Sequence, residues 1–274
     1  MPTYRDYYFA LKNNQNYQFT DTIIYSLFAE VSGLDREHLI LHFDEEAKYQ
    51  NGLNDYIRRI VDGEPYQYVL GYSYFLSHRF VVTPDVLIPR QETEQLVLET
   101  ADLINKHLHG KVSVLDMCSG SGCIGISLAK LIDVEVDMVD ISKKANKIAE
   151  KNNELNKTNC HIYESDMFNS LPLKKYDVII SNPPYIKDES TVDKMTMLNE
   201  PHLALFANPQ TKFYEEIMAK CSDFLAKNGI LAFEIEEDME EKLTKLVKKY
   251  LPDSSFYFKK DIYNKTRFLY IIRK

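Results

Sequence analysis

The chain has 274 residues, a formal net charge of −8 and 27% charged residues. This length suits two domains or one domain with a substantial appendage, and the acidic balance argues against a broad electrostatic surface for duplex nucleic acid. The chain has four cysteines without a Cys-x-x-Cys pair, which predicts a reduced, cytoplasmic protein. We find no apolar run of transmembrane length and no apolar signal segment after Met1, so no membrane partner is expected.

Residues 1 to about 70 are predicted to form a small helical bundle. Thr20 suits the start of a helix that Gly33 ends, and Asp35 suits the start of the next helix. Apolar residues recur at helical spacing again between positions 53 and 60. The first quarter of the chain is therefore expected to be a helical domain.

Residues 71–88 break the helical pattern. Gly71–Phe75 and Arg79–Val82 have the composition of two short strands around Ser77–His78, so a β-hairpin linker is predicted. The expected domains are a helical domain, a hairpin linker and an α/β domain, with boundaries at residues 1–70, 71–88 and 89–274.

The segment after the hairpin has two interpretations. Pro89 ends any strand, and Thr93 between Glu92 and Glu94 suits the start of a helix. Arg90 and Glu92 can instead border a cofactor cleft. The spacing alone favours the simple capped helix.

The rest of the chain alternates short apolar runs with amphipathic segments. Such alternation predicts a mostly parallel sheet with helices on both faces. The expected strands are 112–116, 134–139, 161–163, 176–180, 229–235, 255–258 and 267–272, and the expected helices include 124–131, 142–153, 213–225 and 238–250. The predicted fold class is α/β, with a seven-stranded Rossmann-like sheet.

A loop of small residues follows the first of these strands. Gly120, Gly122 and Gly125 satisfy the Gly-x-Gly-x-x-Gly pattern of dinucleotide-binding turns, and Asp140 lies 20 residues beyond Gly120. Glycines allow a ligand to approach the backbone at the start of a helix, and an acid at the end of the second strand accepts hydrogen bonds from ribose hydroxyls. The pattern by itself fits both NAD and S-adenosylmethionine.

Two features favour S-adenosylmethionine. Asp116 ends the first strand, and three residues separate it from Gly120. A carboxylate at this place suits the amine-bearing methionyl end of that cofactor better than a pyrophosphate. The second feature is the Asn-Pro-Pro-Tyr sequence, Asn182–Tyr185.

Asp166, after the third strand, can accept a hydrogen bond from the adenine amino group, with Met167 or Phe168 against the ring. A helix or turn cap is an equal alternative for Asp166.

The residues Asn182, Pro183, Pro184 and Tyr185 follow the apolar strand 176–180, at the edge of an open sheet where ligands bind. The Asn182 side chain and the Pro183 backbone offer two carbonyl acceptors on a stiff turn, and Tyr185 adds a flat face. Together they can hold one planar NH2 group in line with an electrophile, without a metal. A proline turn that merely ends the strand is the alternative, and the position behind the glycine loop favours function.

These motifs together resemble the release factor glutamine methyltransferases, which are class I S-adenosylmethionine-dependent methyltransferases that modify the glutamine of the Gly-Gly-Gln motif in class I peptide chain release factors. The segments that carry the resemblance are Gly63–Gly71 with Phe75, Leu87–Glu94, the glycine loop, Asp140, Ser165–Phe168, Asn182–Tyr185 and Glu200–Leu205.

The resemblance implies a helical substrate-docking domain, a hairpin linker and a methyltransferase domain. It implies that the cofactor is S-adenosylmethionine and that a class I release factor, bound by a monomer, is the protein substrate. With the residues argued above, the expected cofactor-binding set is Asp116, Cys118, Ser119, Gly120, Ser121, Gly122, Asp140, Asp166, Met167 and Asn182. The expected substrate-binding set is Asn182, Pro183, Pro184 and Tyr185, and no metal is expected.

The sequence departs from the family pattern in three regions. Cys118 replaces the usual glycine at the start of the loop, Phe206–Gln210 lacks the usual glycines, and Glu236 and Met239 stand where a glycine and a glutamine are common. These departures concern the loops near the substrate rather than Asn182.

The expected reaction is direct methyl transfer to the glutamine amide nitrogen. Asn182 and the Pro183 carbonyl align the nitrogen and Tyr185 packs on the amide, so these three are the expected catalytic residues. The alternatives are a ribosomal-protein glutamine methyltransferase, an adenine-N6 nucleic-acid methyltransferase and a non-catalytic binding module. The net charge and the lack of a spare DNA-reading segment after residue 186 argue against stable nucleic-acid binding.

Overall fold

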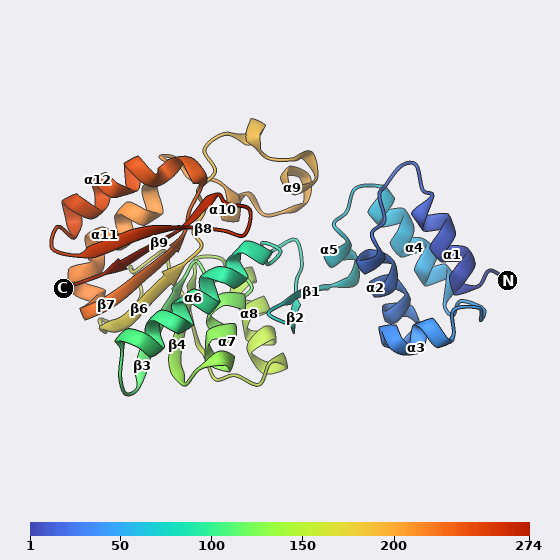
Figure 1. Cartoon of the computed structure of the whole chain (residues 1–274), viewed down its shortest axis with the longest axis horizontal. Coiled ribbons are helices and arrows are strands. Elements are labelled where there is room, and N and C mark those ends of the chain that lie inside the picture. The colour runs from blue at the N-terminus through green and yellow to red at the C-terminus, as the bar shows by residue number, and fades with distance from the viewer. The chain divides into compact units, whose positions relative to one another are not determined.

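In the computed structural model the chain divides after Gly71 into two units, residues Met1–Gly71 and Tyr72–Lys274 (Figure 1). The structure describes residues 1–274 apart from the side chain of Arg36. Each unit is described by itself below.

The first unit is helical, as predicted. Its helices are α1 (Tyr4–Lys12), α2 (Asp21–Ser32), α3 (Arg36–Leu41), α4 (Gln50–Val61) and α5 (Tyr66–Leu70). The Thr20 side chain accepts a hydrogen bond from the backbone N–H of Ile23, and Gly33 ends the same helix with a positive φ of 72°. Asp35 caps the next helix through the N–H of His38. The predicted start and stop signals of these helices are therefore confirmed.

The second unit begins with the hairpin of β1 (Tyr72–Phe75) and β2 (His78–Val81). Phe75 pairs with His78. The two turn residues are Leu76 and Ser77, with φ values of 47° and 63°. The turn therefore lies one residue earlier than the sequence suggested, because His78 already belongs to the second strand.

Seven strands form the predicted α/β sheet, in the order β5-β4-β3-β6-β7-β9-β8. Five of them are parallel, and β9 is antiparallel to both of its neighbours. The strands are β3 (Val112–Met117), β4 (Val134–Asp140), β5 (His161–Glu164), β6 (Tyr176–Ser181), β7 (Leu225–Glu234), β8 (Ser255–Lys260) and β9 (Thr266–Ile272). β7 starts four residues earlier than predicted, because Leu225 already pairs with Tyr176 of β6.

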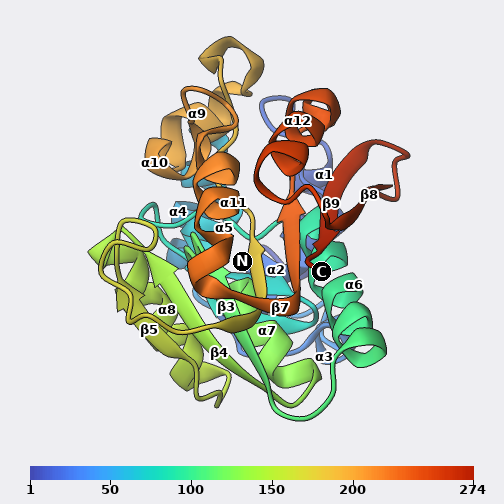
Figure 2. The ribbon, with the colours of Figure 1, turned by 90° about the vertical axis from the view of Figure 1, so that its left-hand side faces the viewer.

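Helices cover both faces of this sheet (Figure 2). The longer ones are α6 (Gln91–His107), α7 (Cys123–Leu131), α8 (Lys143–Leu155), α11 (Lys212–Phe224) and α12 (Glu240–Tyr250). Short helical turns complete the connections: η1 (Glu189–Thr191), α9 (Lys194–Asn199), α10 (His202–Leu205) and η2 (Glu237–Met239).

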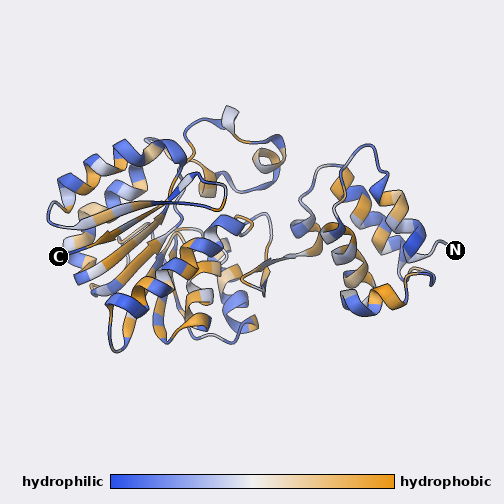
Figure 3. Ribbon diagram, in the orientation of Figure 1, coloured by the Kyte–Doolittle hydropathy of each residue, from blue (hydrophilic) through white to orange (hydrophobic). Residues whose placement is uncertain are grey.

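The alternation of side chains along each strand divides the core into two layers. Val114, Val178 and Ile230 pack with α6, α7 and α8 on one face. Their neighbours Leu115 and Ile179 pack with α11 and α12 on the other face. Figure 3 shows the result as apolar strands between helices whose outer faces are polar. Both faces of the parallel strands are buried, which explains their continuous apolar sequences.

The contact between α7 and the sheet depends on Gly125. A Cβ added there would lie 2.9 Å from Met138 Cγ, 2.9 Å from Val136 Cγ1 and 3.0 Å from an oxygen of Asp116. We expect Gly125→Ala to lower the free energy of unfolding by about 1–3 kcal/mol, because these atoms must move to make room. Equilibrium urea unfolding measures the change.

The matched control for this prediction is Gly52→Ala in α4. A Cβ at Gly52 meets no atom within 4 Å, and alanine favours a helix by about 0.5–1 kcal/mol over glycine. We therefore expect no loss of stability from the control. A Gly125→Ala protein as stable as the native protein would contradict the packing described here.

Candidate active site

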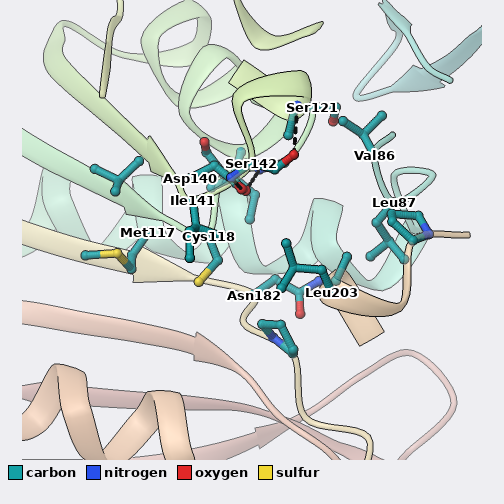
Figure 4. A pocket seen from close by; sticks show the side chains of 18 of the residues that line it. Val86, Leu87, Met117, Cys118, Ser121, Asp140, Ile141, Ser142, Asn182 and Leu203 are labelled. Atoms are coloured by element: carbon teal, nitrogen blue, oxygen red, sulfur yellow. Dashed lines mark hydrogen bonds between the residues drawn. The ribbon is translucent and has the colours of Figure 1, made fainter. Parts of the chain in front are cut away.

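The carboxyl ends of β3, β4 and β6 surround a cavity of about 260 Å³. Figure 4 shows Asp140, Ile141 and Ser142 on one side of it, Asn182 and Leu203 on another, and Val86 and Leu87 on a third. This edge of the sheet is where open α/β folds bind ligands. The sequence-predicted residues that line it are Cys118, Ser119, Gly120, Ser121, Asp140, Asp166, Met167, Asn182 and Pro184.

The loop between β3 and α7 forms one wall of the cavity. The Ser119 N–H donates to the Val139 carbonyl over 2.9 Å, which ties the loop to β4. A Cβ at Gly120, whose φ is 53°, would meet no atom within 4 Å, so the backbone there faces open space. The buried Ser119 hydroxyl has no hydrogen-bond partner among the described residues. A ligand can therefore approach the backbone closely and use this hydroxyl.

Asp140 ends β4 at the cavity. Its two carboxylate oxygens accept hydrogen bonds from the N–H of Gly120 at 2.9 Å and the N–H of Ser142 at 2.8 Å. Each oxygen keeps a further lone pair, so the carboxylate can also accept bonds from two neighbouring hydroxyls. Burial raises the pKa of Asp140. The geometry suits a ribose.

Asp166 and Met167 line the cavity after β5. The turn that holds them is capped by Ser165, whose hydroxyl accepts the N–H of Ser170 at 2.9 Å. The capping role that the sequence left open for Asp166 thus belongs to its neighbour. Met167 has a φ of 49°, and its sulfur lies 4.0 Å from that of Cys118.

Asp116 and Gly122, both predicted to bind the cofactor, do not line the cavity. Asp116 is fully buried, and its carboxylate accepts the N–H of Gly125 at 2.9 Å. Burial raises its pKa to about 8. The expected contact of Asp116 with the methionyl end is wrong for this structure, because strand alternation turns its side chain toward α7. Gly122 faces the core, where a Cβ would meet Ile126 at 3.0 Å.

The four residues of the Asn-Pro-Pro-Tyr sequence divide between two cavities. Asn182 and Pro184 line the first cavity. Asn182, Pro183 and Tyr185 line a second cavity of about 650 Å³. Asn182 therefore stands where the two cavities meet. A group held in the second cavity can reach a ligand in the first one past this side chain.

Two further residues hold Asn182 in place, and the sequence did not identify either of them in that role. The Asn182 amide Nδ2 donates to the Thr93 hydroxyl at 3.3 Å, and that hydroxyl donates to Glu234 Oε2 at 2.6 Å. Thr93 is the third residue of α6, whose N-cap is Arg90 without a side-chain cap. Thr93 therefore lies in the first turn of the helix, as predicted, but its hydroxyl serves Asn182 and Glu234. The sequence signal that could have indicated this contact is an acidic residue, Glu234, at the end of the apolar strand β7, which lies beside β6.

Arg90 lines both cavities, as the alternative interpretation of this segment expected, and it is also the N-cap residue of α6. It forms an ion pair with Glu200, whose side chain is 2% exposed. Glu200 also accepts the N–H of Ile88 at 3.2 Å. The pair ties the segment before α6 to the segment before α10. Glu92 belongs to neither cavity wall.

Cys118, Gln210 and Glu236, which belong to the departures from the family pattern, line these cavities, whereas Met239 does not. Cys118 has a φ of 62°, a conformation that glycine adopts more easily. Glu236 lines the second cavity and pairs with Arg267 at 2.9 Å. Met239 is fully buried in the core.

Within the described residues, no group of three or more His, Cys, Asp or Glu side chains is placed to hold a metal ion. None of the helices in the same residues combines the length and apolar character needed to span a bilayer.

Comparisons with known proteins agree on the class of protein. Residues 10–71 match the family described as PrmC N-terminal domain, and residues 95–205 match the Methyltransferase small domain. The chain is 33% identical over 267 residues to the release factor glutamine methyltransferase of Streptococcus pneumoniae, covering 96% of this chain and 89% of that protein. It is 39% identical over 205 residues to the protein of that name from Bacteroides thetaiotaomicron, covering 72% of each.

A solved structure supports the fold. The 16S rRNA methyltransferase of T. thermophilus, in complex with AdoMet and guanosine, superposes with a TM-score of 0.54 at 16% identity. The match covers 74% of this chain and 50% of that one. The predicted class I methyltransferase fold is thereby confirmed.

Proposed function

This chain belongs to the family of release factor glutamine methyltransferases, and on that premise we propose that it transfers a methyl group from S-adenosylmethionine to the glutamine amide nitrogen of the Gly-Gly-Gln motif in a class I release factor. The observation that carries the proposal is the position of Asn182 at the junction of the two cavities. One cavity then takes the cofactor and the other takes the substrate glutamine.

The residues of the first cavity fit S-adenosylmethionine. Asp140 would hold the ribose hydroxyls, and the open backbone at Gly120 with the unpartnered Ser119 hydroxyl would receive the methionyl part. Asp166 and Met167 would take the adenine. When bound, the cofactor supplies an electrophilic methyl group, which passes to nitrogen while the sulfur keeps the electrons of the broken bond.

The chain's contribution is to position a weak nucleophile. An amide nitrogen shares its lone pair with the carbonyl, so it reacts only when well aligned. Asn182 Oδ1 and the Pro183 carbonyl would accept its two hydrogens, and Tyr185 would pack on the amide plane. Alignment of this kind can supply about 7–11 kcal/mol in favourable cases. We expect the excess proton of the methylated nitrogen to pass to water.

The helical unit is proposed to dock the release factor. Ile40 and Leu41 on α3 are 56% and 79% exposed, and Phe9 on α1 is 52% exposed, so apolar surface is open to a partner. We further propose that the protein works as a monomer in the cytoplasm, where release factors act, without stable binding to nucleic acid.

Transfer of labelled methyl from S-adenosylmethionine to a purified class I release factor tests the proposal. A second copy of the factor, with the glutamine of Gly-Gly-Gln changed to alanine, serves as the control substrate. We expect label in the unaltered factor only. Label in neither factor, while the cofactor still binds, would contradict the proposal and direct the search to ribosomal proteins and then to adenine in nucleic acid.

A further inference from the structure

A chain of hydrogen bonds joins three side chains that lie far apart in the sequence. Asn182 follows β6, Thr93 is in α6, and Glu234 ends β7. The parallel register pairs Ser181 with Phe233, so the next residues along the two strands, Asn182 and Glu234, lie side by side at this end of the sheet. The first turn of α6 crosses this edge and places the Thr93 hydroxyl between them.

The direction of each hydrogen bond in this chain is fixed by chemistry. An ionised carboxylate only accepts, and a hydroxyl has a single proton. Thr93 therefore gives its proton to Glu234, over 2.6 Å, and must accept from Asn182, over 3.3 Å. The NH2 end of the Asn182 amide consequently faces Thr93. Its carbonyl oxygen Oδ1 is turned away from Thr93, free to accept.

Glu234 is itself held firmly. Its side chain is 3% exposed, and its backbone carbonyl accepts the hydroxyl of the fully buried Tyr214 at 2.8 Å. The second carboxylate oxygen accepts the Tyr185 hydroxyl over 3.4 Å. One carboxylate thus contacts Tyr185 directly and Asn182 through Thr93, and these are two of the side chains that are proposed to hold the substrate amide.

We propose that Glu234 is a positioning residue which, acting through Thr93, fixes Oδ1 of Asn182 as the acceptor for the substrate amide and steadies the ring of Tyr185. This inference rests on the proposed function. Glu234 itself does no chemistry on the substrate. It determines which end of a nearly symmetrical amide meets the substrate.

The protonation of Glu234 gives this role a pH signature. Burial raises the pKa of Glu234 to about 7, as does the neighbouring Glu92, whereas the Thr93 and Tyr185 hydroxyls and Arg267 oppose the rise. Above that pH the carboxylate accepts from Thr93. Below it, the protonated acid can donate to Thr93, which then has a proton to give to Oδ1, so the amide can turn over. We expect kcat to fall as the solution is made more acidic through pH 7.

The first test replaces Thr93 with valine, which has the same shape and no hydroxyl. The matched control is Thr100→Val, since Thr100 is a buried threonine on the same helix whose hydroxyl binds the Leu96 carbonyl at 2.7 Å. We expect kcat for methyl transfer to drop about tenfold or more in Thr93→Val, with cofactor Kd unchanged, and to stay near native in Thr100→Val. Thr93→Ser should restore most of the rate.

The second test is the pH dependence of kcat. The acid limb near pH 7 should persist in Thr100→Val and disappear in Glu234→Gln, because an amide does not titrate. Glu234→Gln also serves if Thr93→Val fails to fold.

The possible outcomes distinguish the positioning role from the proposed function. If the native protein transfers methyl and Thr93→Val keeps the kcat and pH profile of Thr100→Val, the positioning role is wrong and the proposed function stands. The positioning role is equally wrong if Glu234→Gln retains the acid limb. If the native protein methylates no release factor, the proposed function fails and the positioning role falls with it.

Discussion

Replacing Asn182 with alanine is expected to lower kcat for release factor methylation by about 10²–10³-fold, the usual cost of removing one preorganised hydrogen-bonding group from a reacting centre. The substrate amide would lose the acceptor that fixes one of its hydrogens, and the Pro183 carbonyl alone cannot orient a planar group. Because Asn182 forms only a small part of the first cavity, cofactor affinity should remain within a few-fold of native. Single-turnover methyl transfer and cofactor titration measure the two effects separately.

Asn153→Ala is the matched control for this variant. The Asn153 side chain also makes local hydrogen bonds, to Thr158 and to both backbone groups of Cys160, but it lies in the second half of α8 and outside both cavities. We expect lower stability and native turnover. Unchanged turnover in Asn182→Ala would contradict the proposed mechanism.

The second large effect is expected from Asp140→Ala, in cofactor binding. Two ribose hydroxyls donating to a carboxylate represent hydrogen bonds of about 1.5–3 kcal/mol each, so the Kd for S-adenosylmethionine should rise about 100-fold or more. The loop would also loosen, because the N–H groups of Gly120 and Ser142 lose their acceptor. Isothermal titration with the cofactor and with its demethylated product gives the affinities.

Asp177→Ala provides the control for Asp140. The Asp177 carboxylate likewise accepts a backbone N–H and a hydroxyl, both from Ser113, at 2.8 and 2.9 Å. It lies near the start of β6, at the other end of the strand from Asn182. Its loss should leave the cofactor Kd unchanged. A native Kd in Asp140→Ala would show that the ribose is held elsewhere.

Much of the fold could be predicted because its parallel strands are buried on both faces. The run Val178–Ile180 is continuous and apolar for that reason, and a helix cap such as Thr20 can be recognised from the local sequence alone. The turn of the hairpin was misplaced by one residue, since Leu76 carries none of the usual signals for a positive φ.

The candidate site was predictable only in its local parts. The glycine loop and the Asn-Pro-Pro-Tyr turn bring their functional groups together within a few residues. The Thr93–Glu234 contact spans 141 positions and depends on the β6–β7 register and on where α6 crosses the sheet. No periodicity in the sequence encodes that crossing. The error at Asp116 is of another kind, because strand alternation alone could have shown that its side chain faces the same layer as Val114.

The proposed mechanism requires that the glutamine side-chain nitrogen, held by Asn182, receives the methyl group. The most direct measurement is a fragmentation mass spectrum of the Gly-Gly-Gln peptide from a class I release factor incubated with the protein and S-adenosylmethionine. We expect one added methyl on the glutamine side chain with the native protein, and almost none with Asn182→Ala at equal time and concentration. A methyl on any other residue, or equal methylation by both proteins, would contradict the mechanism.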